Sequence, residues 1–258
     1  MTSSKRHARI VDALRTTGVA SVRELAERLH VSESTIRRDL KLLDRNGELI
    51  RTYGGAALSL RAPAEEEPFG ISASHDGTMK DAMAERAAAL VPDESVVVLD
   101  IGTSTQRIAR RLRGRPVTVI TSNLAVVDEL RDDEAVRLIL LGGVLRRNYQ
   151  SFVGSLTETA LRQVSADLVM LSCTGVRTNG HVVDDMAVEA PIKQAMIEAA
   201  DRVVLIASEA KFPGTGSLRI CSLADVDVLV TTGGADPHTL DLCRQGGGEV
   251  IVAEPCAG

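Results

Sequence analysis

Residues 32–41 have the sequence Ser32-Glu-Ser-Thr-Ile-Arg-Arg-Asp-Leu-Lys41, a pattern typical of an amphipathic helix. Ile36, Leu40 and Leu43 recur at the i, i+4, i+7 spacing that places apolar side chains in one stripe. Ser32 is suited to cap this helix by accepting from backbone N–H groups of the first turn. The opposite face combines a hydroxyl with three cations, and it consists of Ser34, Arg37, Arg38 and Lys41. Such a face suits phosphates and base edges, although a solvated surface helix has the same pattern.

The preceding residues favour DNA binding over a merely solvated helix. Ser21-Val-Arg-Glu24 is a capping box, in which the serine and the glutamate each satisfy a backbone donor, and it opens a short helix. Two short helices therefore flank His30-Val31, which is the helix-turn-helix arrangement whose second helix enters the major groove. The candidate contacts to double-stranded DNA on this second helix are Ser34, Thr35, Arg37, Arg38 and Lys41.

Charge is divided unevenly along the 258 residues. Residues 1–56 contain eleven Lys or Arg and seven Asp or Glu, a net charge of +4, whereas the remainder contains nineteen and twenty-eight, a net charge of −9. A positive N-terminal part supplies attraction to phosphates, and an acidic bulk indicates a second domain with another task. The absence of Trp, with two Tyr and three Phe, disfavours a single-stranded nucleic-acid platform of stacked rings.

The cysteines and the N-terminus indicate a reduced, cytoplasmic protein. Cys173, Cys221, Cys243 and Cys256 form no CxxC pair and have no histidines at ligand spacing, so we expect neither a zinc site nor a disulfide framework. No other metal site and no cofactor is predicted. Residues 1–7 lack the apolar core of a signal peptide, and no apolar run approaches the length of a membrane span.

Regular patterns also flank the two helices. Residues 3–17 place Ile10, Val11 and Leu14 on one face, and they predict a helix that ends at Gly18 and completes a three-helix core. After the turn signal Asn46-Gly47, the alternating residues 48–53 predict a β-hairpin, or wing. Its residues Arg51 and Tyr53 are candidate DNA contacts, although the hairpin could instead only cover the core.

These residues together resemble a known family. Val31-Ser32, Thr35-Ile-Arg-Arg-Asp-Leu40 and Arg51-Thr-Tyr-Gly-Gly55 are similar to the DNA-binding domain of the DeoR-type bacterial transcription regulators. That family usually has a histidine in the wing where this chain has Tyr53. The resemblance implies a winged helix-turn-helix, and it implies binding as an oligomer to repeated or palindromic DNA sites.

The chain is predicted to divide into a DNA-binding domain over residues 1–57, a linker over 58–77 and an α/β domain over 78–258. The linker contains Arg61-Ala-Pro-Ala-Glu-Glu-Glu-Pro68 and has no regular apolar period. Beyond it, short apolar runs alternate with helical patterns, which predicts an open, mostly parallel sheet with helices on both faces. The strand candidates are residues 95–100, 117–121, 136–141, 168–172, 203–207, 226–231 and 250–253. The helix candidates are residues 79–90, 104–113, 123–131, 155–164, 187–200 and 236–244.

Loops that follow the predicted strands carry residues suited to an anion, and ligands of such sheets bind at the carboxyl ends of strands. Asp100-Ile-Gly-Thr-Ser-Thr105 and Thr121-Ser-Asn123 each join a strand to a helix N-terminus, where free N–H groups bind anions. Leu141-Gly-Gly143 leads to Arg146 and Arg147, either of which could bring positive charge to a phosphate, and Lys211 adds a cation after a later strand. Each loop alone is ordinary turn chemistry, but together they predict a small phosphorylated ligand.

The DeoR-type resemblance extends over this region. Asp100-x-Gly-Thr-Ser-Thr, Thr121-Ser-Asn, Leu141-Gly-Gly with Arg146, and Glu189-x-x-x-Lys193 are similar to the family's sensor domain, whose fold is similar to sugar-phosphate isomerases. The resemblance implies a sugar-phosphate effector held by Gly102, Thr103, Ser104, Thr121, Asn123 and Lys211. The chain departs from the family pattern at Ser208 and Thr232.

Two functions are consistent with this pattern. The first is a homo-oligomeric transcription regulator, a repressor by the family resemblance, whose DNA affinity falls when a phosphorylated sugar binds. The second is a sugar-phosphate isomerase with a DNA-binding arm, which would need a general base from the acidic residues Asp184, Asp185 and Glu189. We expect the regulator, because acidic residues near a helix start also simply favour the helix dipole.

Overall fold

The computed structural model describes residues 6–7, 9–10, 13–14, 19–45, 49–52, 54–58 and 77–254. The chain forms two compact units, Met1–Glu67 and Pro68–Gly258. The interior of the predicted linker lies outside the described residues, so the predicted domain limits stay a prediction.

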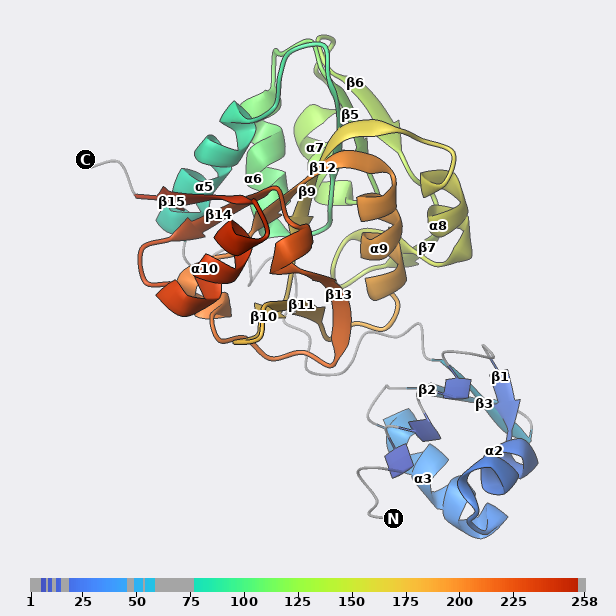
Figure 1. Cartoon of the computed structure of the whole chain (residues 1–258). Coiled ribbons are helices and arrows are strands. Elements are labelled where there is room, and N and C mark those ends of the chain that lie inside the picture. Colours follow the sequence, from blue (N-terminus) through green and yellow to red (C-terminus); the bar gives the residue numbers. More distant parts are fainter. Residues whose placement is uncertain are drawn as a thin grey trace. The chain divides into compact units, whose positions relative to one another are not determined.

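The N-terminal unit contains a helix-turn-helix packed on a small antiparallel sheet (Figure 1). Residues 6–7, 9–10 and 13–14 are helical, and Ile10 and Leu14 are buried as predicted. The remaining elements are β1 (Val19–Ser21), α2 (Val22–Leu29), α3 (Glu33–Arg45), β2 (Leu49–Thr52) and β3 (Gly55–Leu58).

The wing has one strand more than the sequence predicted. β2 and β3 form the expected hairpin, but β1 pairs with the other edge of β3 in the order β1-β3-β2. A strand of three residues leaves no measurable alternation in the sequence, so its pairing is visible only in the fold. The apolar stripe of α3 completes the core, because Ile36, Leu40 and Leu43 are all buried.

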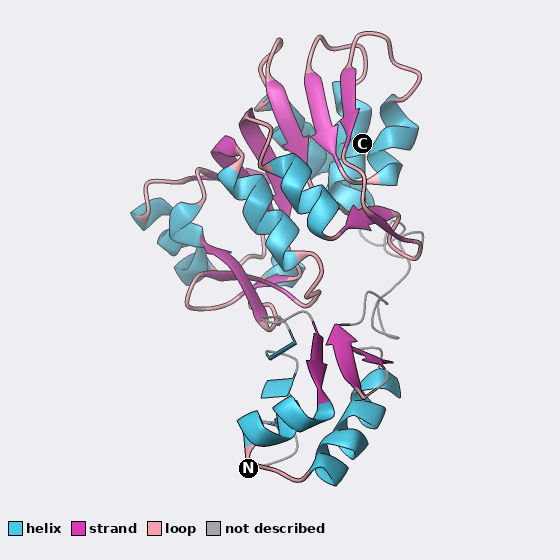
Figure 2. Ribbon diagram, turned by 90° about the vertical axis from the view of Figure 1, so that its right-hand side faces the viewer, coloured by secondary structure: helices cyan, strands magenta, loops and turns pink. Residues whose placement is uncertain are grey.

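The C-terminal unit is a seven-stranded sheet in which every neighbouring pair is parallel, as predicted. Figure 2 shows its strands side by side with helices packed against them. In the order of the sheet the strands are β15 (Glu249–Ala253), β14 (Val228–Thr232), β12 (Ala200–Ile206), β9 (Ala166–Ser172), β4 (Val96–Leu99), β5 (Thr118–Thr121) and β6 (Arg137–Leu140). The helices are α5 (Gly77–Ala89), α6 (Thr103–Leu112), α7 (Leu124–Leu130), α8 (Ser155–Leu161), α9 (Ala190–Glu198) and α10 (Pro237–Gln245).

Helices cover both faces of this sheet. Val97 and Leu99 of β4 pack into one core with α5, α6 and α7, whereas Val98 packs into the other with α8, α9 and α10. Successive side chains of a strand point to opposite faces, so strands covered on both faces need the continuous apolar runs seen in the sequence. The predicted fold class is therefore confirmed.

Two small sheets and two short 3₁₀ turns were not predicted. An antiparallel ribbon, which we call the β7–β8 ribbon, joins β7 (Val144–Arg146) to β8 (Ser151–Val153). A second sheet has the order β10-β11-β13. Its strands and the two turns are β10 (Gly175–Val176), β11 (His181–Asp184), β13 (Leu218–Ser222), η1 (Glu209–Lys211) and η2 (Leu223–Asp225).

The strand order creates a switch point in the larger sheet. From β4 the chain proceeds outward through β5 and β6, and it then returns to place β9 on the other side of β4. The connections that leave β4 and β9 therefore run in opposite directions and open a crevice at the carboxyl ends of these two strands. This is the place where open α/β sheets bind ligands.

Candidate functional site

The helix α3 presents its polar face to solvent. Ser34, Arg37, Arg38 and Lys41 are exposed and Thr35 is half-buried. Ser32 caps the helix as predicted, because its Oγ accepts from the Thr35 N–H at 3.3 Å and shares hydrogen bonds with the hydroxyls of Ser34 and Thr35. The first turn of α3 is therefore fixed, and its hydroxyls and cations lie on one exposed face.

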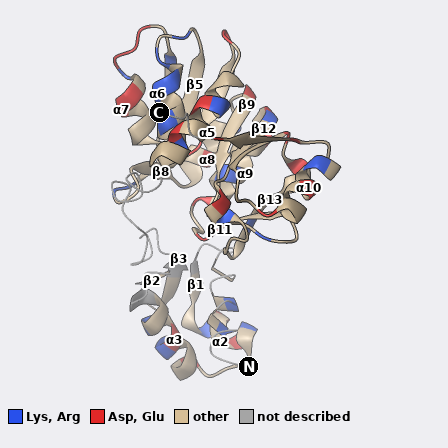
Figure 3. Ribbon diagram, turned by 90° about the vertical axis from the view of Figure 1, so that its left-hand side faces the viewer, with Lys and Arg blue, Asp and Glu red and all other residues tan. Residues whose placement is uncertain are grey.

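The cations of this face differ in their surroundings. Arg37 donates to the Glu33 carboxylate at 2.8 Å, an i, i+4 ion pair on the same helix. Both signs of charge occur along α2 and α3 in Figure 3. Because Arg37 must leave its partner to meet a phosphate, Arg38 and Lys41 are the stronger candidates for the first contacts to DNA.

The preceding helix and the turn hold α3 in place. The capping box is present, since the Glu24 N–H donates to Ser21 Oγ at 3.1 Å and the Ser21 N–H to Glu24 Oε2 at 2.7 Å. His30 ends α2 in the left-handed conformation, with φ of 54°. This local sequence produces the turn that sets the angle between the two helices.

Asp39 anchors α3 from its buried side, a role that the sequence did not indicate. Arg6 donates to this carboxylate through Nε and Nη2, and the His7 ring lies 2.9 Å from it. Burial raises the pKa of Asp39, but hydrogen bonds and charge from Arg6 and His7 outweigh burial and lower it. The contact joins the first helical segment to the recognition helix.

Two of the predicted DNA contacts, Arg51 and Tyr53, belong to the wing. Arg51 belongs to β2, and its side chain is outside the described part of the chain. Tyr53 lies wholly outside the described residues. Gly54, which follows it, has φ of 83°, as a tight turn between β2 and β3 requires.

At the switch point, the N-terminus of α6 presents backbone donors to the crevice. Gly102 precedes the helix with φ of 119°, a conformation that glycine adopts without strain. Within the described residues the backbone N–H groups of Thr103, Ser104 and Thr105 have no hydrogen-bond acceptor. The first N–H groups of a helix are free by geometry and carry partial positive charge, so they bind anions.

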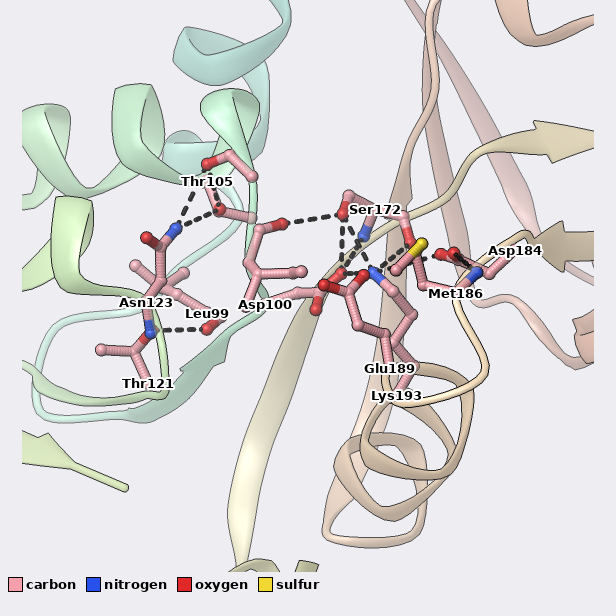
Figure 4. A network of polar contacts seen from close by, with 12 residues as sticks. Leu99, Asp100, Thr105, Thr121, Asn123, Ser172, Asp184, Met186, Glu189 and Lys193 are labelled. Carbon is pink, nitrogen blue, oxygen red and sulfur yellow. Dashed lines mark hydrogen bonds and ion pairs between the residues drawn. The ribbon is translucent and has the colours of Figure 1, made fainter. Parts of the chain in front are cut away.

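Thr121 and Asn123 lie beneath this helix start and hold it from below (Figure 4). Thr121 Oγ1 donates to the Leu99 carbonyl at 2.8 Å, and Asn123 Nδ2 donates to the Gly102 carbonyl at 3.2 Å. Thr105 Oγ1 also donates to the Gly102 carbonyl, at 2.9 Å. With both side chains fully buried, Thr121 and Asn123 position the loop. Thr103 and Ser104, at the start of the helix itself, are the candidates for direct contact with a ligand.

Asp100 is held by a buried lysine that the sequence did not single out as a site residue. Lys193 of α9 forms an ion pair with Asp100, donates to the Ser172 carbonyl at 3.1 Å, and lies 3.8 Å from the Asp184 carboxylate. Figure 4 shows these side chains converging between the ends of β4 and β9. Burial lowers the pKa of Lys193, but Asp100 and Asp184 outweigh burial and raise it. Lys193 is therefore charged, and it joins the carboxyl ends of β4, β9 and β11 at the switch point.

Ser172 completes the attachment of Asp100. The Ser172 N–H donates to Asp100 Oδ2 at 2.9 Å and the Ser172 hydroxyl donates to the same oxygen at 2.7 Å. With Lys193 and Ser172 bound to it and 1% of its surface exposed, Asp100 orders the loop that leads to Gly102.

Gly143 lies in the connection between β6 and β7, and Arg146 is the last residue of β7. Arg146 is buried and forms an ion pair with Glu189, the residue before α9. A Cβ on Gly143 would lie 2.3 Å from Thr157 Oγ1 and 2.6 Å from the Val153 carbonyl, so glycine is required there by packing. The structure thus brings Asp100, Gly102, Thr103 and Ser104 together and assigns Gly143 to the support of α8.

Lys211 lies near the same edge, in η1 after β12. Burial raises the pKa of the Cys173 thiol to about 12, and the positive charges of Lys211 and Lys193 oppose that rise. Cys173 directly follows β9, so Lys211 is close enough to the switch point to act on a charge there. Lys211 is half-buried and can turn toward a ligand.

The two departures from the family pattern occur at the ends of neighbouring strands, with Ser208 after β12 and Thr232 as the last residue of β14. Thr232 Oγ1 accepts from the Glu209 N–H at 2.8 Å and donates to Glu209 Oε2 at 3.3 Å. Glu209, the neighbour of Ser208, also accepts from the Gly234 N–H at 2.8 Å. Thr232 therefore binds the chain neighbour of Ser208 and fixes η1, the 3₁₀ turn that contains Lys211.

The described part of the chain contains neither a membrane-spanning helix nor a cluster of metal-binding side chains. None of its helices is long and apolar enough to cross a membrane. No group of three or more His, Cys, Asp or Glu in the same residues has the arrangement of a metal site.

Family models match both units. The model described as a DeoR-like helix-turn-helix domain matches residues 6–61, and the model described as the DeoR C-terminal sensor domain matches residues 76–233. The chain belongs to the DeoR family of transcriptional regulators.

Curated DeoR-family relatives align over nearly the whole chain. A putative aga operon transcriptional repressor of Escherichia coli O157:H7 is 31% identical over 97% of this chain and 94% of its own length. The glycerol-3-phosphate regulon repressor of Escherichia coli K12 is 30% identical over 90% and 91%. An L-fucose operon activator of Haemophilus influenzae is 29% identical over 88% and 91%. Among solved structures, ribose 5-phosphate isomerase A from Methanocaldococcus jannaschii aligns over 53% of this chain and 54% of its own at 15% identity, with a TM-score of 0.39.

The DeoR-type motif around α9 acquires a physical role in this structure. Glu189 and Lys193 are the two residues of that motif that reach the buried partners Arg146 and Asp100. A sequence signal was present, because Lys193 lies among Ile192, Ala195 and Met196 on a helix with few other charges. A lysine at such a position requires a buried carboxylate.

Proposed function

We propose that this DeoR-family protein is a cytoplasmic repressor of carbohydrate-metabolism genes that leaves its operator DNA when a phosphorylated sugar binds the C-terminal unit. The observation that carries the proposal is the start of α6, where three backbone N–H groups without acceptors face the switch point of the sheet. The names of two repressor relatives, one of them of a glycerol-3-phosphate regulon, support the choice of repression and of a phosphate ester.

On the DNA side, we assign the base and phosphate contacts to the exposed face of α3 and to the wing. Arg38 has no acidic partner among the described residues and is placed to reach a base edge, while Lys41 one turn later suits a phosphate. The full set of proposed contacts is Ser34, Thr35, Arg37, Arg38, Lys41, Arg51 and Tyr53.

On the effector side, we place the phosphate at the N–H groups of Thr103 and Ser104. Gly102 lets the ligand approach the backbone, and Lys211 supplies a cation at the same edge. Asp100, Thr121 and Asn123 hold the loop in its binding geometry from beneath. Arg146 contributes through its ion pair with Glu189 and Gly143 through its close packing on Thr157, and neither contacts the phosphate directly.

The proposal requires linkage between the two sites. An effector can release DNA only to the extent that it binds the DNA-free arrangement more tightly than the DNA-bound one. The test is a fluorescence-anisotropy titration of the protein's own upstream DNA at moderate salt, with and without sugar phosphates. Specific binding that weakens on addition of one phosphate ester supports the proposal, and absence of specific binding refutes it.

We further infer that the protein acts as a regulator without catalytic turnover. An isomerase needs a base that can reach substrate, but Asp184 is buried and accepts from the N–H groups of Asp185 and Met186. Glu189 is buried against Arg146, which leaves Asp185 as the exposed member of the acidic cluster. Turnover of ribose or amino-sugar phosphates by the purified protein would contradict this inference.

We also propose that the protein binds DNA as a homo-oligomer, because one recognition helix reads too few base pairs for operator specificity. A candidate surface lies at the edge strand β6. Leu140, Val144, Leu145 and Leu156 are four of six large apolar side chains that are exposed in the described residues, and Leu156 is 71% exposed. Thr157 Oγ1 donates to the Gly142 carbonyl at 2.9 Å, which places α8 beside the turn that links these residues.

A second copy of the chain fits this surface. β6 has a strand partner on one side alone, so its free edge can pair with the same edge of another copy about a twofold axis, and the leucines then bury one another. Leu156→Lys should lower the mass measured by analytical ultracentrifugation. Val252→Lys, at the opposite edge strand β15, is the matched control. Equal masses for wild type and both variants would show that the surface is not an interface.

A further inference from the structure

The β7–β8 ribbon is packed directly on the loop after β5. The Phe152 N–H donates to the Ser122 carbonyl, and the Leu124 N–H donates to the Gln150 carbonyl, both at 2.8 Å. These two bonds flank an antiparallel bridge in which Ser151 lies opposite Asn123. The ribbon is therefore attached to the loop that supports the start of α6.

Ser151 belongs to a row of three residues that point to the same side. Asn123 is opposite Ser151 in the bridge, and Arg146 is opposite Ser151 in the ribbon. Residues that face each other across antiparallel strands project their side chains to one face, with Cβ atoms about 5 Å apart. On one side of the row Asn123 reaches the Gly102 carbonyl, and on the other side Arg146 reaches Glu189. The Ser151 side chain between them must point toward the switch point.

The hydroxyl of Ser151 is unsatisfied. Ser151 is fully buried, and its Oγ has no hydrogen-bond partner within the described part of the chain. A buried polar group without a partner destabilises the fold, so its presence needs a reason. The backbone donors of Thr103, Ser104 and Thr105 also lack an acceptor in the described part of the chain, and they follow Gly102, whose carbonyl binds the Asn123 that lies opposite Ser151. One anionic oxygen group would satisfy both.

Tyr149, in the turn of the ribbon, lies over the same place. Its hydroxyl is 3.9 Å from the position that a Cβ on Gly102 would take, and Ser172 Oγ is 3.5 Å from that position. The Arg146 guanidinium lies 5.4 Å from the centre of the Tyr149 ring and holds it against the ribbon. Two hydroxyls therefore surround the glycine that opens α6.

We propose that Ser151 and Tyr149 bind the effector directly, and that the β7–β8 ribbon is one wall of the effector site. The Ser151 hydroxyl donates to a phosphate oxygen held at the start of α6, and the Tyr149 hydroxyl contacts the same phosphate or the adjacent ester oxygen. The ligand class is a phosphate monoester of a small polyol, since the start of α6 together with Ser151 and Tyr149 offers donors for one anionic group. This inference rests on the proposed function of that site.

The test is calorimetric titration of the full chain with inorganic phosphate and with a panel of sugar phosphates. Ser151→Ala should weaken phosphate binding by about tenfold, the ordinary loss for one hydrogen bond to a charged group. Tyr149→Phe keeps the ring beside Arg146 and should weaken binding by a smaller factor.

Ser122→Ala is the matched control. Ser122 is also fully buried with an unpartnered hydroxyl, but it precedes Asn123 and is not part of the bridge that aligns Ser151 with Asn123. The affinity of the Ser122→Ala protein for phosphate should equal that of wild type. Because both serine variants remove a hydroxyl that satisfies no partner, calorimetric melting should show both folded.

The possible outcomes separate this inference from the function on which it rests. If wild type binds a phosphate ester and Ser151→Ala binds it equally well, the ribbon is not a wall of the site, while the effector proposal stands. If wild type binds neither phosphate nor any sugar phosphate, the effector proposal fails and the assignment of Ser151 fails with it. If phosphate binds alone and no sugar phosphate competes with it, the site takes an adventitious ion only and the inference is overturned.

Discussion

Replacing Lys193 with Met should destabilise the C-terminal unit more than any other single change of a charged residue proposed here. The substitution keeps the length of the side chain and removes the ammonium group that Asp100 and Asp184 face. It leaves two carboxylates, each less than a twentieth exposed, beside one another without a cation. Breaking a buried pair in this way costs about 3–5 kcal/mol.

That cost can be converted into a melting temperature. For a unit of this size, 1 kcal/mol shifts the midpoint by roughly 2–4 °C, so Lys193→Met should lower it by about 6–20 °C. Differential scanning calorimetry is the suitable assay, because the chain has no Trp and separate units can give separate transitions. Lys211→Met, a half-buried lysine of the same unit, is the control and should shift the midpoint by only a few degrees.

The pH dependence provides a second, independent check. The folded pKa of Lys193 is raised, so its stabilisation is complete below its unfolded pKa and is lost as pH rises through the folded pKa, on the alkaline side of about pH 10. In Lys193→Met the two buried carboxylates face each other without a cation, and protonation of one of them relieves their repulsion. The variant should therefore regain stability as pH is lowered from 7 toward 5, and Asp100→Asn in the same chain should restore part of the loss at pH 7. A melting temperature within 2 °C of wild type at both pH values would refute the buried pairing.

Three further predictions concern the sites. Arg38→Ala should reduce both the affinity for the operator and the preference for the operator over random DNA. Lys41→Ala should weaken binding to operator and to random DNA alike and lower the salt dependence by about one counterion, as measured by anisotropy at several salt concentrations. Wild-type affinity in both variants would show that α3 faces elsewhere. Asp39→Asn should lower the free energy of unfolding of the N-terminal unit by about 2 kcal/mol at pH 7, as measured by urea unfolding. Because the pKa of Asp39 is lowered in the folded unit, the difference in stability between variant and wild type should vanish as pH falls below about 4. Lys211→Ala should weaken the release of DNA by a sugar phosphate at least tenfold in the same anisotropy assay, and full release at the wild-type concentration would contradict its placement at the effector site.

The elements of the larger sheet could be predicted because each carries its own local signal. β4 and β9 are continuous apolar runs, and their alternate residues face two different cores. The β7–β8 ribbon gives no such signal, since its strands have three residues each and include the buried Arg146. Such strands are stabilised by attachment to distant loops, as in the bridge between Ser151 and Asn123. Local periodicity does not contain this information.

The candidate site was predictable in part for the same reason. A glycine and hydroxyl residues after β4 indicated an anion site from local chemistry alone, and the structure brings Gly102, Thr103 and Ser104 to the carboxyl end of that strand. The strand order that creates the switch point is not local. Asp100 meets Ser172 across 72 residues and Lys193 across 93, so the residues that rigidify the site could not be read from spacing.

The position of the β7–β8 ribbon suggests how effector binding can reach the DNA. Ser151 and Arg146 face each other on the side of the ribbon that we propose lines the effector site, whereas Leu145 and Phe152 pair on its opposite face, and Leu145 and Leu156 are both exposed. An effector held by Ser151 would favour one position of the ribbon, and the same ribbon forms part of the proposed subunit surface. The effector would then change how two copies meet, and with it their affinity for operator DNA. Substitutions at Leu145 or Phe152 should therefore change how strongly the effector releases the protein from DNA. They should have much less influence on the affinity of the effector for the DNA-free protein.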